Sequence, residues 1–106
     1  MHRYRAALLS LTAVVAAATG ATSAFAVDAD QGGVLARRWC ATCHVVAPGQ
    51  QQASTQAPPF SAIANKPGFD AGQLALYLLL PHPRMPDMNM SRAEAADLAA
   101  YIDSQR

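Results

Sequence analysis

The sequence predicts an all-α fold of three to four helices connected by long loops. Three segments, near residues 30–40, 70–80 and 91–102, combine helix-capping residues with apolar residues at helical spacing. No stretch alternates apolar and polar residues as a half-buried strand does, and no internal repeat is visible. The segments between the helix candidates are rich in Pro, Gly, Gln, Ser and Thr, as loops are.

The first 26 residues have the pattern of a secretory signal peptide. Arg3 and Arg5 precede an uncharged apolar stretch that ends in small residues, and Ala24-Phe25-Ala26 fits the small-x-small cleavage rule. An uncleaved membrane anchor is the alternative, but the apolar run is short and alanine-rich, and no stop-transfer flank follows it. We therefore expect residues 1–26 to be removed and residues 27–106 to form one domain without a stable membrane span.

The expected mature chain is small and nearly neutral. Removing 26 of the 106 residues leaves 80. Six of the eight Lys and Arg then remain together with all seven Asp and Glu, which gives a net charge of −1. Without a basic face, the chain is not expected to bind nucleic acid. A core of this size usually needs a disulfide, a metal or a cofactor to stabilise it. Cys40 and Cys43 are too close in sequence to close a useful disulfide loop.

The first helix is expected to begin at Asp30, as its N-cap, and to end at about Cys40. Leu35 and Trp39 are four residues apart, so they would share one apolar face of this helix. From residue 45 to residue 59 no apolar period is visible. A loop this long in so small a domain usually wraps around something.

A second helix is expected to begin near Asp70, with Gln73 at the capping-box position, and to end before Pro81. Its apolar residues are Leu74, Tyr77, Leu78 and Leu80, and Tyr77 is expected to belong to the core. Residues 81–86 contain three prolines, which favour a rigid, extended strap.

The last helix is expected to begin after Ser91, with Glu94 completing a capping box. The residues of its apolar face recur at helical spacing: Ala95, Leu98, Ala99 and Ile102. This pattern predicts an amphipathic helix that packs on the rest of the core.

Residues 40–44, with the sequence C-A-T-C-H, match the C-x-x-C-H pattern of c-type haem attachment. The two thiols add to the two vinyl groups of one haem, which requires them to lie one helical turn apart. His44 follows the second thiol and would be held under the iron as its proximal ligand. One covalent haem would also stabilise a domain that is too small to hold a cofactor by burial alone.

Three other interpretations of this motif are weaker. A thioredoxin-like C-x-x-C needs a βαβ context, which the sequence lacks. A zinc site needs a fourth nitrogen or sulfur ligand, and His2 and His82 are the remaining histidines, of which His2 leaves with the signal. A plain disulfide does not explain His44. The motif therefore favours haem.

The sixth ligand of the iron is expected to be a methionine from the strap. Histidine with methionine is the ligand pair of electron-transfer haems, and the thioether raises the reduction potential. Met85 stands between Arg84 and Pro86, where a stiff backbone can hold a sulfur in place. Met88 and Met90 could be apolar cover for the haem edge, and Met88 is the main rival as a ligand.

With this motif, the Met-Pro strap and the closing helix, the chain resembles the small bacterial class I cytochromes c over about the whole of residues 27–106. The resemblance implies a cytochrome c-like fold wrapped around one covalent haem. In that family the ligand methionine is often followed by proline, with a Ser-capped helix six residues later, a layout that Met85 and Ser91 match. The family also implies that the carbonyl of Pro58 accepts the Nδ1 proton of His44 and so orients the ring.

The resemblance further implies that the first and last helices cross at nearly right angles, where a glycine meets an aromatic residue. Gly32 or Gly33 against Tyr101 would serve. The chain departs from the family at Ala36, where a bulkier residue is common, and at Trp39 directly before the motif.

The function that the resemblance implies is single-electron transfer in the periplasm, with no enzymatic activity. The haem c, ligated by His44 and Met85, would pass electrons between redox partners such as a periplasmic dehydrogenase and a terminal oxidase, either as a free shuttle or as a subunit of such a complex. Two rivals remain. An enzyme or gas sensor would have five-coordinate, high-spin iron, and a haem-free thiol-redox domain would show no Soret absorption.

Signal cleavage is directly measurable. Mass spectrometry of the exported protein should find a chain that begins at or near Val27 and is heavier by one haem, because the signal pattern ends at Ala26. A periplasmic product that begins at Met1 would contradict this expectation.

Overall fold

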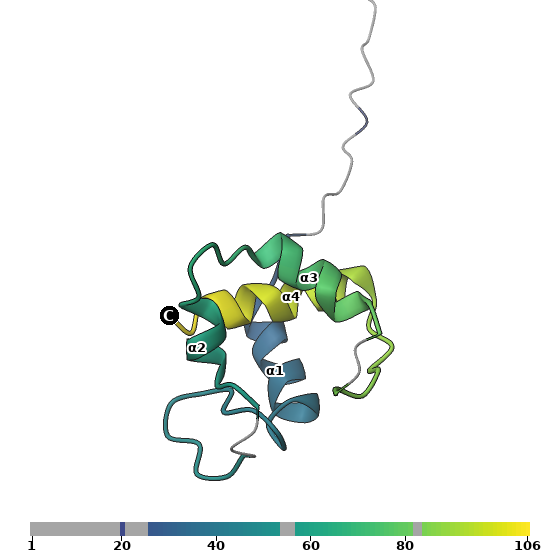
Figure 1. The fold of residues 1–106 in the computed structure, drawn as a ribbon. Helices are drawn as coiled ribbons and strands as arrows, with labels where there is room; N and C mark the ends of the chain where they lie inside the picture. Colours follow the sequence, from purple (N-terminus) through teal and green to yellow (C-terminus); the bar gives the residue numbers. More distant parts are fainter. Residues whose placement is uncertain (1–19, 21–25, 54–56, 82–83) are drawn as a thin grey trace, which may run out of the picture.

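The computed structural model describes residues 20, 26–53, 57–81 and 84–106. It contains four helices, α1 (Ala29–Trp39), α2 (Phe60–Ala64), α3 (Ala71–Leu79) and α4 (Arg92–Asp103), and no strand within the described residues (Figure 1). The predicted all-α class is confirmed. The predicted signal peptide lies almost entirely outside the described residues. Among the described helices, none has the length and apolar character that a membrane span requires.

Helix α1 begins two residues earlier than predicted, because its N-cap is Asp28 and not Asp30. The Asp28 carboxylate accepts hydrogen bonds from the N–H groups of Asp30 and Gln31, each at 3.0 Å. The backbone N–H of Asp28 in turn donates to the Asp97 carboxylate of α4 at 2.8 Å. The tertiary contact with α4 therefore selects the first of two possible capping aspartates, and Asp30 lies in the first turn, where its charge favours the helix dipole.

Helices α1 and α4 cross at a point of very close approach, as Figure 1 shows. A Cβ atom on Gly32 would lie 2.0 Å from the backbone oxygen of Asp97 and 2.9 Å from Cβ of Tyr101. On Gly33 it would lie 2.9 Å from the Tyr101 ring. The predicted contact between these glycines and Tyr101 is confirmed. Ala36 is fully buried at the same interface, so a small residue lets α4 approach where the family often has a larger one.

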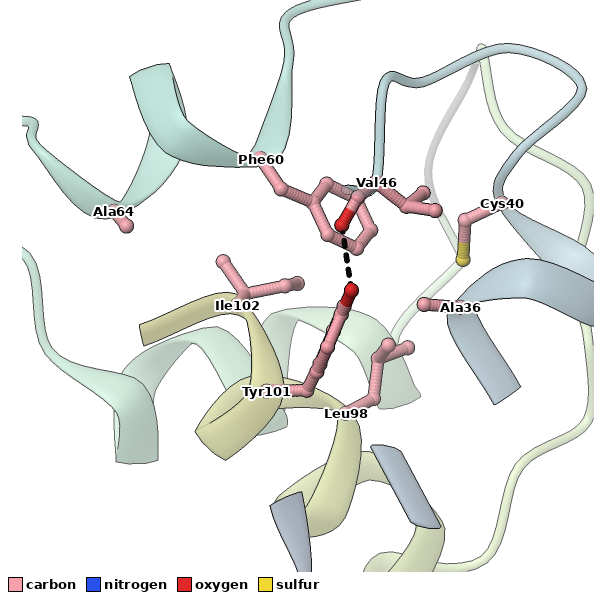
Figure 2. Packing of buried hydrophobic residues seen from close by; sticks show 8 residues of the cluster. All are labelled: Ala36, Cys40, Val46, Phe60, Ala64, Leu98, Tyr101 and Ile102. Atoms are coloured by element: carbon pink, nitrogen blue, oxygen red, sulfur yellow. Dashed lines mark hydrogen bonds between the residues drawn. The ribbon is translucent and has the colours of Figure 1, made fainter. Parts of the chain in front are cut away.

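The core lies between α4, the end of α1 and α2. All four predicted apolar residues of α4 are buried. The full capping box is present at its start: Glu94 N–H donates to Ser91 Oγ at 3.1 Å, and Ser91 N–H donates to the Glu94 carboxylate at 2.8 Å. Figure 2 shows the central cluster, which consists of Ala36, Cys40, Val46, Phe60, Ala64, Leu98, Tyr101 and Ile102.

Helix α3 forms where predicted but is less buried than predicted. The Asp70 side chain accepts the N–H of Gln73 at 2.8 Å, and the helix ends before Pro81. No residue of α3 is fully buried; Leu74 and Leu78 pack partly against the core. The expectation that Tyr77 belongs to the core is wrong, since its side chain is 52% exposed. Tyr77 lies at the wall of a cavity, together with Leu74.

Helix α2 is the element that the sequence analysis does not predict individually. It has five residues, begins after Pro59 and buries Phe60 and Ala64. One and a half turns are too short for a helical period to be visible in the sequence. Its burial depends on packing against α4, which no local pattern encodes.

The close crossing of α1 and α4 can be tested with one methyl group. Gly32→Ala should lower the free energy of unfolding by about 2 kcal/mol, because the clash with the α4 backbone, about 3 kcal/mol, outweighs the gain in helix propensity of about 1 kcal/mol. The measurement is guanidinium unfolding followed by circular dichroism. Gln31→Ala, at the exposed neighbouring position, should change stability by less than about 0.5 kcal/mol. Equal effects of the two substitutions would contradict the crossing.

Candidate haem site

The C-x-x-C-H motif forms a turn that continues directly from the end of α1. Cys40 is the C-cap of α1, and its N–H donates to the Ala36 carbonyl at 2.9 Å. The N–H groups of Cys43 and His44 then donate to the Cys40 carbonyl at 3.1 and 2.8 Å. No disulfide joins the two cysteines, of which Cys40 is buried and Cys43 exposed. The motif therefore runs from the interior to the surface within one turn.

The environment of Cys40 is unsuited to thiol-disulfide chemistry. Burial raises the pKa of the Cys40 thiol to about 11, and the neighbouring Cys43 adds to this rise. Reactive thiols of redox proteins have a lowered pKa, because the thiolate is the nucleophile. A thioredoxin-like role for this pair is therefore disfavoured by its surroundings as well as by the all-α fold.

His44 is buried and its ring is held in one orientation. It is 8% exposed, and its Nδ1 atom lies 2.6 Å from the Pro58 carbonyl oxygen. A carbonyl oxygen can only accept, so Nδ1 carries a proton, and in the neutral imidazole Nε2 then holds the lone pair. The Phe60 ring packs against the imidazole with 5.4 Å between ring centroids. Within the described residues Nε2 has no protein partner, which makes it a buried nitrogen available to an iron ion.

The segment that follows His44 is held by two other elements. Phe60 N–H, at the start of α2, donates to the Val45 carbonyl at 2.9 Å. The Tyr101 hydroxyl of α4 donates to the Val46 carbonyl at 2.8 Å, a buried bond that Figure 2 shows as a dashed line. The orientation of the imidazole thus depends on α2 and α4 as well as on the motif.

His44 and Met85 line one cavity of about 430 Å³. This volume lies within the range of cofactor sites, roughly 300–1,000 Å³. Most of the wall is apolar, and the other lining residues are Pro58, Ile63, Lys66, Pro67, Gly68, Phe69, Asp70, Gln73, Leu74 and Tyr77. Met88 and Met90 do not line the cavity, and Met90 packs against the core instead.

The residues present fit a haem better than a metal ion alone. Within the described part of the chain, no three His, Cys, Asp or Glu side chains gather as a metal site would need. His82, the alternative ligand considered from the sequence, lies outside the described residues. One imidazole nitrogen and one thioether line the largely apolar cavity, and the two thiols lie in the turn that leads to His44 without lining the cavity themselves. These side chains are the types that would attach and ligate a haem c.

An all-α fold with this motif and cavity defines a small c-type cytochrome. The chain is 50% identical over 99 residues to cytochrome c-552 from Bradyrhizobium diazoefficiens, and the alignment spans 93% of this chain and 95% of that protein. No family model and no solved structure matches the chain. The chain belongs to the c-type cytochromes related to cytochrome c-552, electron carriers with one covalently bound haem c.

Gln50 belongs to the site but is not predicted from the sequence. Its side-chain amide contacts the backbone at both ends of the haem motif. It is the first of three consecutive glutamines in a loop, and nothing in that run distinguishes it from Gln51 or Gln52.

Proposed function

We propose that this cytochrome transfers single electrons through a haem bound by Cys40 and Cys43 as thioethers and ligated by His44 and Met85. The observation that carries the proposal is the shared cavity, into which one buried imidazole and one methionine are brought from segments about 40 residues apart. The bound haem would supply a one-electron iron couple between these two ligands.

The residues around the ligands suit electron transfer. The Pro58 carbonyl holds the His44 ring at Nδ1, which fixes the orientation of Nε2 and raises its basicity as a ligand. Met85 lies directly before Pro86 in a strap stiffened by prolines, so its thioether needs little reorganisation to stay in place. Two protein ligands would leave no open position for a substrate, and we therefore propose that the chain is not an enzyme.

The site of action that we propose is the periplasm. The support is the signal-peptide pattern of residues 1–26, which would export the chain before haem attachment. The partners would be a periplasmic dehydrogenase and a terminal oxidase, with the cytochrome free or part of one of these complexes. The contact would be small and transient.

The segment around Cys43 supports a docking face that carries no charge of its own, although Arg37 and Arg38 are exposed in the preceding turn of α1. Residues 39–65, which include the whole haem motif and the loop after it, contain no Asp, Glu, Lys or Arg. Cys43, Thr42, Pro48 and Gly49 are exposed there. A charged side chain of the partner that was buried against this face would lose its hydration without gaining an ion pair. We therefore expect a partner surface that is itself short of charge.

The ligand pair is tested by the weak far-red absorption band that oxidised His/Met haem shows and that disappears when the thioether leaves. Met85→Ala should abolish this band and lower the reduction potential, because a harder or absent ligand stabilises ferric iron. Optical spectroscopy and redox titration measure the two effects.

The other two methionines of the strap are the matched controls. Met88→Ala and Met90→Ala should keep the band and lower the free energy of unfolding by about 1–2 kcal/mol, since both side chains are half-buried. If Met88→Ala loses the band and Met85→Ala keeps it, the ligand is Met88.

The docking face is tested by adding one charge to it. Gln51→Lys places a cation in the exposed loop after the motif and should speed oxidation of the reduced protein by ferricyanide about twofold at about 0.1 M salt, where the Debye length is about 10 Å.

Gln31→Lys adds the same charge at the other end of α1, about 13 Å further along the helix axis, and should have little effect at that salt concentration. Stopped-flow absorption measures both rates. Equal acceleration by the two lysines would show that electrons do not leave near Cys43.

A further inference from the structure

The side chain of Gln50 connects the haem motif to the loop that follows it. Its Oε1 atom accepts the N–H of Val46 at 2.9 Å. Its Nε2 atom donates to three backbone carbonyls, those of Ala41 at 3.0 Å, His44 at 2.7 Å and Gln52 at 2.9 Å. One half-buried side chain thus bonds to four backbone groups over residues 41–52.

The surroundings allow one orientation of this amide. Val46 offers an N–H and the other three partners offer carbonyl oxygens, so a flipped amide would place like groups against each other four times. Two N–H bonds serve three acceptors, which means that one hydrogen is shared. The shortest of these contacts is the one to the His44 carbonyl.

Each carbonyl of the three-residue segment from His44 to Val46 is held by a different element. Gln50 holds that of His44, the α2 N–H of Phe60 holds that of Val45, and the Tyr101 hydroxyl holds that of Val46. Gln50 also reaches Ala41, inside the motif. It therefore adds a side-chain connection between the attachment turn and the segment carrying the imidazole, beside the backbone bond from His44 N–H to the Cys40 carbonyl.

We infer that Gln50 is a positioning residue for the proximal ligand: it pins the His44 backbone so that Nδ1 meets the Pro58 carbonyl and Nε2 keeps its orientation in the cavity. The inference rests on the proposed role of His44 as an iron ligand. Without the Gln50 amide, the His44 carbonyl loses its partner and the 2.6 Å bond to Pro58 loses its support from the main chain. A weaker Nδ1 bond makes the ring less basic, which favours ferrous iron and raises the reduction potential.

The test compares Gln50→Ala with Gln51→Ala in the mature holoprotein. Gln51 is the matched control, because its amide makes one exposed contact, to the Gly49 carbonyl at 3.3 Å. Gln50→Ala should raise the reduction potential and change the haem-methyl shift pattern in the NMR spectrum of the oxidised protein. It should also speed hydrogen exchange of the His44 Nδ1 proton about tenfold, which is the effect of losing hydrogen bonds of ordinary strength. Gln51→Ala should leave all three at wild-type values.

If Gln50→Ala does not mature, Gln50→Glu is the second variant, since it keeps the size and the acceptor for Val46 N–H but replaces the amide donor. Its exchange rate and methyl pattern are the relevant measurements, because the added charge shifts the potential by itself. Wild-type exchange and methyl pattern in either Gln50 variant would overturn the inference.

Failure of the proposed ligation has a different signature. In that case the His44 ring protons of the wild-type protein would show no paramagnetic shift. If they are shifted in the wild type and the Gln50 variants leave both that shift and the exchange rate unchanged, His44 is the ligand and Gln50 does not position it.

Discussion

The close crossing of α1 and α4 at Gly32 is the contact on which the geometry of the site depends. It brings Tyr101 against the glycines, and the Tyr101 hydroxyl then reaches the Val46 carbonyl two residues after His44. Because that bond is buried, its loss would leave a carbonyl without a partner, at a cost of about 1–3 kcal/mol. A helix-packing contact distant from the cavity thereby determines where the imidazole lies.

The protein core is incomplete without the haem that its family carries. Helix α3 has no fully buried residue, and its Leu74 and Tyr77 line the cavity beside His44. A domain of about 80 residues can bury little apolar surface, so a large apolar cofactor adds to the core as well as to the function. Attachment through two thiols keeps that cofactor in place where burial alone would not.

Electron transfer by a small cytochrome needs one edge of the cofactor near solvent and ligands that do not move. In the proposed site the motif would provide the first, since Cys40 is buried and Cys43 is exposed one turn later. Several independent contacts would provide the second at His44. Pro58 holds the ring of His44, and Gln50, Phe60 and Tyr101 hold the main chain around it. Rigid ligation lowers the structural change that accompanies a change of iron charge.

The sequence alone determined the helical class, the capping box at Ser91 and the haem motif, because each depends on short-range spacing or on a local pattern that the chain carries by itself. The glycine–tyrosine contact joins residues far apart in sequence and was expected only from the resemblance to the family. Tertiary structure decided the choice of Asp28 over Asp30 as a cap, the existence of α2, the exposure of Tyr77 and which of three consecutive glutamines, Gln50, bonds to the haem motif. Each of these features depends on a contact with a residue that is distant in sequence or with a backbone group. Because every residue type carries the same backbone groups, the sequence does not reveal such contacts.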